Sequence, residues 1–242
     1  MDKEEIFLAS LKDAKINAEF NNKITLFRFL DLHEQELVKK YIGDSLNVYF
    51  SSGFNDGEYK RCIIAPFPIT PDFKITIFEV CYDKRFMSLG HKNILGALMS
   101  LGIKRDVIGD IVLADDKYYG AVVSEMKDYL INEVRTENIR FSLEERENIN
   151  VSSSEEYDVK LYFLASMRLD LCISQVYHLS RAESFELISG GYVKLNHVLC
   201  QNSSKVLAAY DVVSIRTKGR MKVFSIMEKT KSGKIKAMLG RL

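Results

Sequence analysis

Cationic side chains gathered in the C-terminal third of the chain are the residues whose chemistry stands out first. Residues 161–242 hold 13 Lys and Arg against 5 Asp and Glu, whereas residues 1–71 hold 9 against 11 and residues 72–160 hold 12 against 17. The whole-chain net charge of +1 therefore hides one strongly basic end. Clustered Lys and Arg side chains neutralise phosphates and release counterions, which supplies most sequence-independent affinity for nucleic acid. A well-solvated surface with uneven charge is the alternative, and charge alone does not decide between them.

The stretch that opens this basic segment has the pattern of two helices followed by a strand. Three apolar residues at helical spacing give the first helix a buried face: Leu169, Ile173 and Val176. Ser180 and Glu183 match a capping box that starts the second helix, and Gly190-Gly191 ends it. Apolar and polar residues then alternate along a short strand. The pattern leaves three cations free to point to solvent: Arg168, Arg181 and Lys194.

Residues 168–219 resemble the RNA-binding domain named after ribosomal protein S4. The matching positions are Arg168-Leu169-Asp170, Ser180-Arg181, Leu187-Ile188, Gly191, Val193, Asn196, Val206, Asp211, Val213, Arg216 and Gly219. The resemblance implies that eight residues lie on or beside an RNA-binding face: Arg168, Ser180, Arg181, Lys194, Asn196, Lys205, Arg216 and Arg220. To these we add Lys218, and His197 as a residue that either contacts RNA or is a loop histidine without a special role.

Some residues of this segment predict packing rather than RNA contact. Tyr210 stands where the S4 pattern has glycine, and Ser184 where it has a small apolar residue. Neither departure removes a cation. We expect Asp170 and Asp211 to orient neighbouring backbone and arginines, because a basic module needs carboxylates to fix its cations. We expect Arg181 to be an exposed first-turn residue whose replacement by alanine costs folding no more than about 0.5 kcal/mol.

Two weaker candidates for phosphate contact lie outside the basic segment. Lys104 and Arg105 follow Gly102 and precede a predicted strand, so they are either a second RNA-binding pair or a charged pair at a helix exit. The loop Gly53–Gly57, followed by Lys60 and Arg61, lacks the glycine–lysine spacing of a phosphate-binding loop. It predicts a plain hairpin.

The elements that must position these residues predict an α+β protein of three domains. The three prolines cluster between Pro66 and Pro71, which indicates a connector. We predict an N-terminal α+β domain at residues 1–70, a ferredoxin-like, RRM-like domain at 71–165 with possible RNA contacts, and an S4-type RNA-binding domain at 166–242. The middle domain has the order strand, helix, strand, strand, helix, strand. Enzymes and regulatory modules share that order, so it does not by itself indicate RNA.

Periodicity and end signals place the individual elements. Predicted helices cover residues 2–20, 33–41, 91–101 and 124–134, the last with Ser124 as N-cap. Predicted strands cover residues 47–51, 61–65, 73–81, 108–113 and 118–123, with one or two more between 139 and 164. Residues 151–156 are polar and predict a surface loop.

Composition argues against several classes of protein. Hydrophobic residues make up 47% and charged residues 28%, which fits a globular chain. No apolar run is long enough for a membrane span, and the acidic start lacks the core of a signal peptide, so we predict a cytoplasmic protein without membrane contact. The four cysteines and four histidines are scattered, which argues against a metal, a disulfide framework or a cofactor.

A wider resemblance covers nearly the whole chain. Leu89-Gly90-His91 and Leu95–Ile111 look like the middle domain of the bacterial YlmH family, also called RqcP, and Thr25–Gln35 and Gly53–Pro66 look like its first domain. The resemblance implies a non-catalytic factor of the large ribosomal subunit. Such a factor holds peptidyl-tRNA while a stalled chain receives an untemplated C-terminal tail. Implied partners are ribosomal RNA, tRNA and other quality-control factors. The family has also been linked to cell division. We expect a monomer.

Other functions remain as alternatives. An RNA-modifying enzyme of the pseudouridine synthase type would carry a catalytic aspartate in a G-R-L-D type loop, which the chain lacks, and usually has its S4 module at the front. A tyrosyl-tRNA synthetase would need signature loops that are also missing. A cell-division scaffold that contacts only proteins is not separated by sequence. We predict no catalytic residue.

Overall fold

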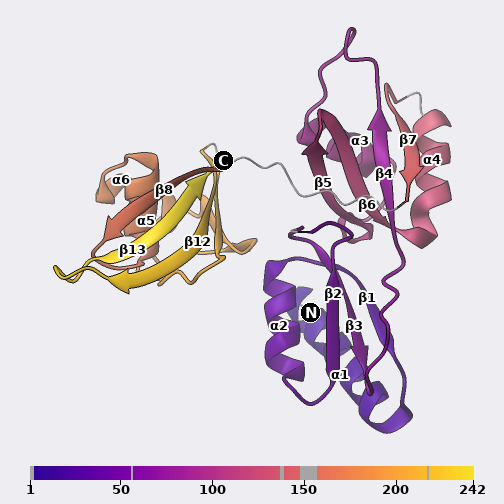
Figure 1. The fold of residues 1–242 in the computed structure, drawn as a ribbon, viewed down its shortest axis with the longest axis horizontal. Coiled ribbons are helices and arrows are strands. Elements are labelled where there is room, and N and C mark those ends of the chain that lie inside the picture. The colour runs from indigo at the N-terminus through magenta and orange to yellow at the C-terminus, as the bar shows by residue number, and fades with distance from the viewer. Residues whose placement is uncertain (1–2, 56, 137–138, 148–156, 217) are drawn as a thin grey trace. The chain divides into compact units, whose positions relative to one another are not determined.

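A computed structural model describes residues 3–55, 57–136, 139–147, 157–216 and 218–242. The predicted α+β class is confirmed: the described chain contains three antiparallel sheets with helices (Figure 1). It divides into two compact units, Met1–Ser154 and Glu155–Leu242. No helix in the described ranges has the length and apolar character needed to cross a bilayer. The predicted loop at residues 151–156 lies outside the described residues.

The N-terminal module of the first unit is a three-stranded sheet backed by two helices. Its elements are α1 (Lys3–Asn21), β1 (Thr25–Leu30), α2 (Leu32–Ile42), β2 (Asn47–Ser51) and β3 (Lys60–Ala65), and the sheet order is β1-β3-β2. Buried residues of the two helices, such as Leu11 and Val38, share one core with Cys62 and Ile64 of the sheet. The predicted hairpin is present, since β2 and β3 pair antiparallel. Strand β1 was not predicted.

The middle module is a four-stranded sheet with helices on one face. Its elements are β4 (Ile75–Cys81), α3 (His91–Ser100), the 3-10 turn η1 (Arg105–Val107), β5 (Ile108–Ala114), β6 (Lys117–Val123), the 3-10 turn η2 (Ser124–Met126), α4 (Lys127–Thr136) and β7 (Ser142–Arg146). The sheet order is β5-β6-β4-β7. Ile94 of α3 and Leu130 of α4 pack on Phe78 and Val80 of the sheet. Strands and helices therefore follow one another in the predicted order.

Ser124 is not the N-cap of α4, contrary to our prediction. It lies in the 3-10 turn η2, and α4 begins at Lys127. The Ser124 hydroxyl instead lies 2.9 Å from the hydroxyl of Thr76 on β4. A cross-sheet hydrogen bond has taken the group that the cap would have needed.

Part of the second face of the middle sheet packs against the N-terminal module. Phe29 and Phe54 pack against Val112, Ala121 and Val123 in a core of their own. The close approach depends on a missing side chain at Gly109, where an added Cβ would lie 2.7 Å from the ring of Phe29. Apolar residues from both modules are thus buried together.

A buried arginine also joins the two modules. The side chain of Arg61 on β3 is 8% exposed. Its Nε donates to the Phe27 carbonyl and its Nη1 to the Lys74 carbonyl, both at 2.9 Å. The Tyr59 amide donates to Asp110 of β5 at 3.0 Å. The predicted domain 1–70 is therefore one module of a larger unit that also includes the following sheet.

The C-terminal unit is a six-stranded sheet with two helices on one face. Its elements are β8 (Asp158–Leu164), α5 (Leu169–Tyr177), α6 (Arg181–Ser189), β9 (Val193–Leu195), β10 (Val198–Leu199), β11 (Val212–Ile215), β12 (Gly219–Lys229) and β13 (Ile235–Arg241). The sheet order is β10-β9-β11-β12-β13-β8. Leu169, Ile173 and Ile188 of the helices share a core with Val213 and Ile215.

Strand β8 lies in this C-terminal sheet. It pairs with β13 along its whole length, from Asp158 opposite Arg241 to Leu164 opposite Ile235. Our predicted boundary assigns residues up to 165, with one or two strands between 139 and 164, to the middle domain. The long-range pairing with β13 puts β8 in the second unit, so this unit starts before the predicted position 166.

Candidate nucleic-acid interface

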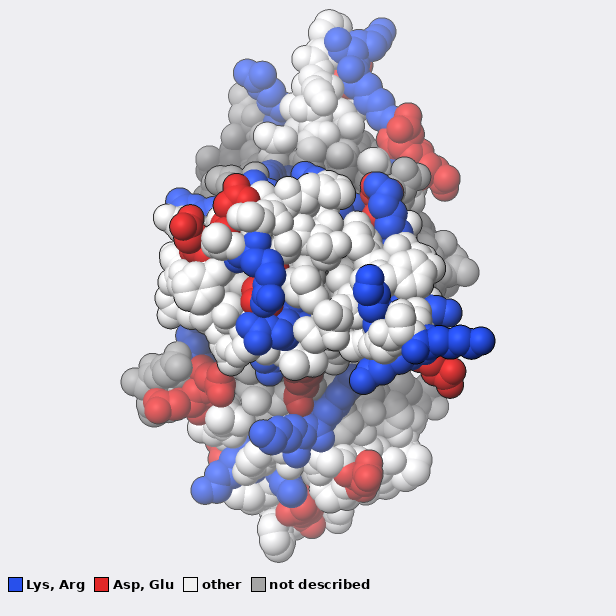
Figure 2. Space-filling model, turned by 90° about the vertical axis from the view of Figure 1, so that its left-hand side faces the viewer, with Lys and Arg blue, Asp and Glu red and all other residues white. Residues whose placement is uncertain are grey.

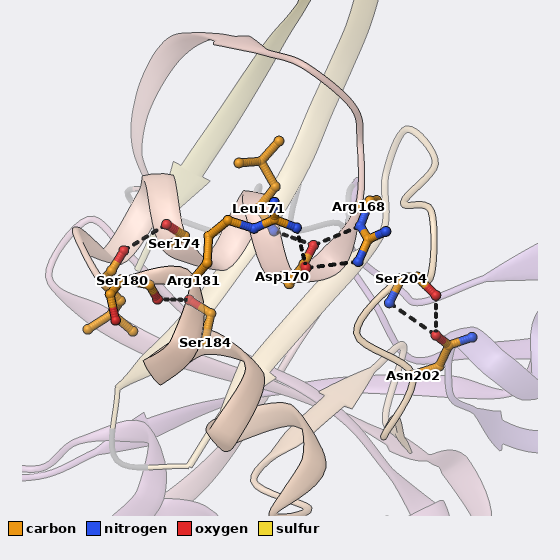
Figure 3. A network of polar contacts seen from close by, with 10 residues as sticks. Arg168, Asp170, Leu171, Ser174, Ser180, Arg181, Ser184, Asn202 and Ser204 are labelled. Carbon is orange, nitrogen blue, oxygen red and sulfur yellow. Dashed lines mark hydrogen bonds and ion pairs between the residues drawn. The ribbon is translucent and has the colours of Figure 1, made fainter.

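Two arginines from two helices converge on one buried carboxylate at the centre of the candidate interface (Figure 3). Arg168 donates from Nε to Asp170 Oδ1 at 3.1 Å and from Nη2 to Oδ2 at 3.0 Å. Arg181 donates from Nη2 to the same Oδ2 at 2.7 Å. One carboxylate oxygen thus holds both guanidinium groups side by side. We call these three residues the arginine pair and its carboxylate.

Local sequence signals place each arginine at a helix start. Arg168 is the N-cap of α5, where the chain is still extended. Ser180 is the N-cap of α6, and the predicted capping box is confirmed: the Glu183 amide donates to the Ser180 hydroxyl at 3.1 Å, and the Ser180 amide donates to Glu183 Oε2 at 2.7 Å. Arg181 therefore falls in the first turn of α6. From there its side chain reaches Asp170 in the first turn of α5.

Asp170 is ionised despite its burial. Its side chain is 7% exposed, and this desolvation alone would raise its pKa. Hydrogen bonds from Arg168 and Arg181 outweigh the burial, so the pKa of Asp170 lies below its usual value. The Leu171 amide adds a further donor at 2.8 Å. The expected role of Asp170 in orienting arginines is confirmed.

The contact with Asp170 gives Arg181 a role in folding that an exposed first-turn residue would not have. The side chain is 61% exposed, yet it is one of two cations that neutralise a buried carboxylate. Removing both arginines leaves that carboxylate buried without a counterion, which costs several times the roughly 0.5 kcal/mol expected for a surface change. A test of RNA binding therefore has to treat the arginines and Asp170 together.

Acid should weaken the C-terminal unit through Asp170. Because the folded-state pKa of Asp170 lies below the unfolded value of about 3.9, its stabilising contribution is present above that pH and is lost as pH falls through the folded pKa. We expect Asp170→Asn to lose less stability than the parent between pH 7 and pH 3. Urea unfolding of both proteins at the two pH values measures the difference. Equal losses in the two proteins would contradict the assignment.

A third cation is carried by a loop beside the arginine pair. The segment from Asn202 to Lys205 is folded on itself, with Asn202 Oδ1 accepting from the Ser204 amide at 3.0 Å. The Leu169 amide donates to the Lys205 carbonyl at 2.8 Å, so this loop is attached to the start of α5. Lys205 is exposed. Figure 2 shows the side of the C-terminal unit that carries α6, from which Lys and Arg side chains project. We call Arg168, Arg181 and Lys205 the helical face.

Lys194 and Arg220 lie on a different surface. Both are paired directly with Ser214, on β9 and β12 respectively, so their side chains share its side of the sheet. The neighbouring residues Val213 and Ile215 point to the core under the helices. Lys194 and Arg220 therefore project from the sheet surface turned away from α5 and α6, which we call the sheet face. Arg216 is exposed and Lys218 half-buried in the turn between β11 and β12.

Asn196, which the sequence places on or beside the RNA-binding face, has its side chain buried in a hydrogen-bond network. Its side chain donates to Asp211 at 2.9 Å and accepts from the Val212 amide at 2.9 Å. Asn196 and His197 have φ of 48° and 72°, as a two-residue type I′ hairpin turn requires of both positions. The turn geometry accounts for the backbone conformation of both residues. The expected role of Asp211 in orienting neighbouring backbone is confirmed, since Asp211 also accepts from the Ala208 amide at 2.8 Å.

Tyr210 adopts the backbone conformation that its unusual position demands. Its φ is +72°, in the left-handed region where glycine is the usual residue. The side chain is 72% exposed. The departure from the S4 pattern noted in the sequence thus falls at a strained position.

Lys104 and Arg105 differ in their surroundings, and neither of the two explanations offered for the pair describes Arg105. The guanidinium of Arg105 lies 4.1 Å from the ring centroid of Tyr59 and donates to the Ile108 carbonyl. It therefore contributes to the contact between the two modules of the first unit. Lys104 is exposed.

The chemistry offered by the described side chains is that of charged and hydrogen-bonding groups. In the described ranges no three His, Cys, Asp or Glu side chains gather as metal ligands would. Burial raises the pKa of Cys62 and Cys172 to about 12, so these thiols stay protonated. Paired guanidinium groups with spare N–H donors can form bidentate contacts with phosphate.

Comparison with known proteins places this arrangement in a family. Residues 68–150 match the family model "Putative RNA-binding domain in YlmH". The chain is 30% identical over 238 residues to "Ribosome-associated protein quality control protein P2" of Bacillus subtilis (strain 168), covering 96% of this chain and 92% of that protein. The chain belongs to the YlmH family.

A solved structure supports the YlmH assignment for the fold. "Cell division protein ylmH from Streptococcus pneumoniae" is 26% identical, with a TM-score of 0.50 over 61% of this chain and 93% of that one. The resemblance to the YlmH family seen in the sequence is therefore confirmed. The YlmH model spans the middle module and not the basic C-terminal unit.

Proposed function

We propose that the protein is a non-catalytic RNA-binding factor that associates with the large ribosomal subunit and peptidyl-tRNA. There it supports C-terminal tailing of stalled nascent chains in ribosome-associated quality control. The observation that carries the RNA-binding part is the arginine pair, held by Asp170 on the surface of the most basic unit. The Bacillus relative's name supports the ribosomal context.

The fold supports the same proposal. We assign the middle module to the ferredoxin-like class, because its strand order β5-β6-β4-β7 and its alternation of strands and helices match that arrangement. We assign the C-terminal unit to the S4 class from its two capped helices and the following short strands. In this proposal the helical face is the main RNA-binding surface of the unit.

The covered sheet of the middle module shifts RNA binding toward the C-terminal unit. RNA-recognition domains stack bases on an open sheet face. Here Phe29 and Phe54 pack on one part of that face, and the ion pairs of Glu79 with Lys117 and Arg146 occupy another part. Any RNA contact of residues 68–150 would then come from the rim of the module, where exposed Lys104 lies.

The two guanidinium groups suit phosphate because Asp170 neutralises only one of their two charges. Asp170 accepts three N–H groups from Arg168 and Arg181, which leaves the remaining donors of both arginines for a ligand. The first-turn amides of α6 add positive potential beside Arg181. A phosphate can therefore be held by groups that are already in place before it arrives.

Affinity for ribosomal RNA or tRNA should fall steeply with salt. Each phosphate neutralised contributes about −0.7 to the slope of log K against log salt for a single strand. Fluorescence anisotropy from low to physiological salt measures this slope for the parent. We expect a slope of roughly −2 or steeper if the three cations of the helical face act together. A flat response would contradict phosphate neutralisation.

Two experiments test the proposed function. Crosslinking and nuclease footprinting in a cell extract should recover large-subunit ribosomal RNA and tRNA with the tagged protein. Recovery of neither would contradict the proposal. The purified protein should form no pseudouridine in ribosomal RNA or tRNA, and detection of turnover would favour the RNA-modifying alternative instead.

A further inference from the structure

The sheet face of the C-terminal unit continues beyond Lys194 and Arg220 into a surface of aromatic and aliphatic side chains. On β8, Leu161 and Phe163 are 46% and 50% exposed. They are paired with Met238 and Lys236 of β13, so all four side chains share one side of the sheet. The core side is occupied by Leu164 and the residues under the helices. This surface is separate from the helical face.

Phe224 is held on the same surface by a neighbouring glycine. An added Cβ at Gly240 would lie 2.6 Å from the Phe224 ring, so the absence of a side chain there lets the ring lie across β13. Tyr157 meets the ring edge to face, with centroids 5.5 Å apart. Gly240 is paired with Lys222, whose Nζ lies 5.7 Å from the Phe224 centroid. The ring is thus fixed in place with a cation beside it.

Each of the two phenylalanine rings on this surface therefore has a lysine as its immediate neighbour. Phe163 lies opposite Lys236, and Phe224 lies beside Lys222. None of the paired positions named here carries a carboxylate. A ligand that fits must offer flat apolar groups and negative charge at a short repeat. Single-stranded nucleic acid has this chemistry, with one base and one phosphate per nucleotide.

We propose that the sheet face binds an unpaired RNA segment, with bases on Phe163 and Phe224 and phosphates on Lys222, Lys236 and Arg220. This proposal rests on the proposed function, because it assumes that the protein acts on RNA. It adds a second surface, on the opposite side of the sheet from the arginine pair. The C-terminal unit then holds two RNA segments, one on each side.

A pair of oligonucleotide probes tests the stacking directly. The parent should bind a short oligouridylate about tenfold more tightly than an abasic oligomer of the same length, since stacking contributes about 1–3 kcal/mol per base. Phe163→Ala should remove about half of that difference in binding free energy, because Phe224 still stacks one base. Lys222→Glu with Lys236→Glu should weaken binding of both probes about tenfold or more.

A matched charge reversal at the tip of the β12–β13 hairpin is the control. Lys231 and Lys234 are exposed there, and Lys231→Glu with Lys234→Glu changes the net charge by the same amount. Thermal melting of each variant verifies folding, and Leu161→Glu offers a second, independent disruption of the surface. The proposal is overturned if the sheet-face variants bind both probes as the control does. If the parent binds no RNA at all, the proposed function is overturned as well. If the parent binds RNA and the sheet-face variants bind equally well, only the proposal about the sheet face fails.

Discussion

Replacing Arg168 and Arg181 by alanine and Asp170 by asparagine in one protein should abolish association with large ribosomal subunits while the chain stays folded. Each arginine can form charge-assisted hydrogen bonds to phosphate of about 1.5–3 kcal/mol. Losing two such contacts should weaken binding by at least about 100-fold. The asparagine that replaces Asp170 carries no charge, so no buried carboxylate is left without a counterion. Co-sedimentation with large subunits measures the loss.

Two comparisons make this result specific. Lys231→Ala changes the net charge by the same single unit as the triple variant, and it should co-sediment like the parent. Arg168→Ala with Arg181→Ala, keeping Asp170, should be less stable than the triple variant, because the Asp170 carboxylate is left without a counterion. If the triple variant still co-sediments like the parent, the helical face does not hold the ribosome and exposed Lys104 becomes the next candidate.

Arg61→Leu should destabilise the first unit by about 2 kcal/mol, because a buried and a partly buried carbonyl lose their donor at a cost of about 1–3 kcal/mol for a fully buried group. Arg61 Nε donates to the carbonyl of Phe27 in the N-terminal module, and Nη1 donates to the carbonyl of Lys74, just before β4. Leucine keeps the apolar volume and offers no donor. Urea unfolding followed by the fluorescence of the tyrosines should show the shift. Arg61→Lys, with one donor group instead of two, should fall between parent and leucine variant.

Lys40→Leu is the matched control for Arg61, since it also removes one cation but from an exposed position on α2. It should change stability by no more than about 0.5 kcal/mol. Equal effects of the two substitutions would mean that Arg61 does not hold the modules together. The RNA affinity of both variants should match the parent, because the C-terminal unit has its own core.

Local signals predicted the helical part of the candidate interface well. The capping box at Ser180 and Glu183 and the double glycine after α6 involve neighbours in sequence, and both lie where expected. The contact of Arg181 with Asp170 could not be predicted from the sequence, because it depends on how the two helices pack. A helix periodicity shows which residues face the core, not which charges meet above it.

Strands that serve two purposes were the hardest to predict. In β1, Phe27 belongs to the core with α1 and α2, while Phe29 belongs to the core with the middle sheet. The strand therefore lacks the alternation of a half-buried strand. Strand β8 pairs with β13 at the far end of the unit, and no local pattern encodes that partner. Its Leu161 and Phe163 are apolar, yet they are exposed on the sheet face.

Mapping of protein–RNA crosslinks by mass spectrometry on the native complex is the most direct test of the central claim. The claim is that the arginine pair and its neighbouring loop are the principal RNA contact. We expect crosslinked peptides to contain Arg168, Arg181 or Lys205, with large-subunit ribosomal RNA or tRNA attached. Crosslinks confined to residues 68–150, with none in the C-terminal unit, would contradict the account.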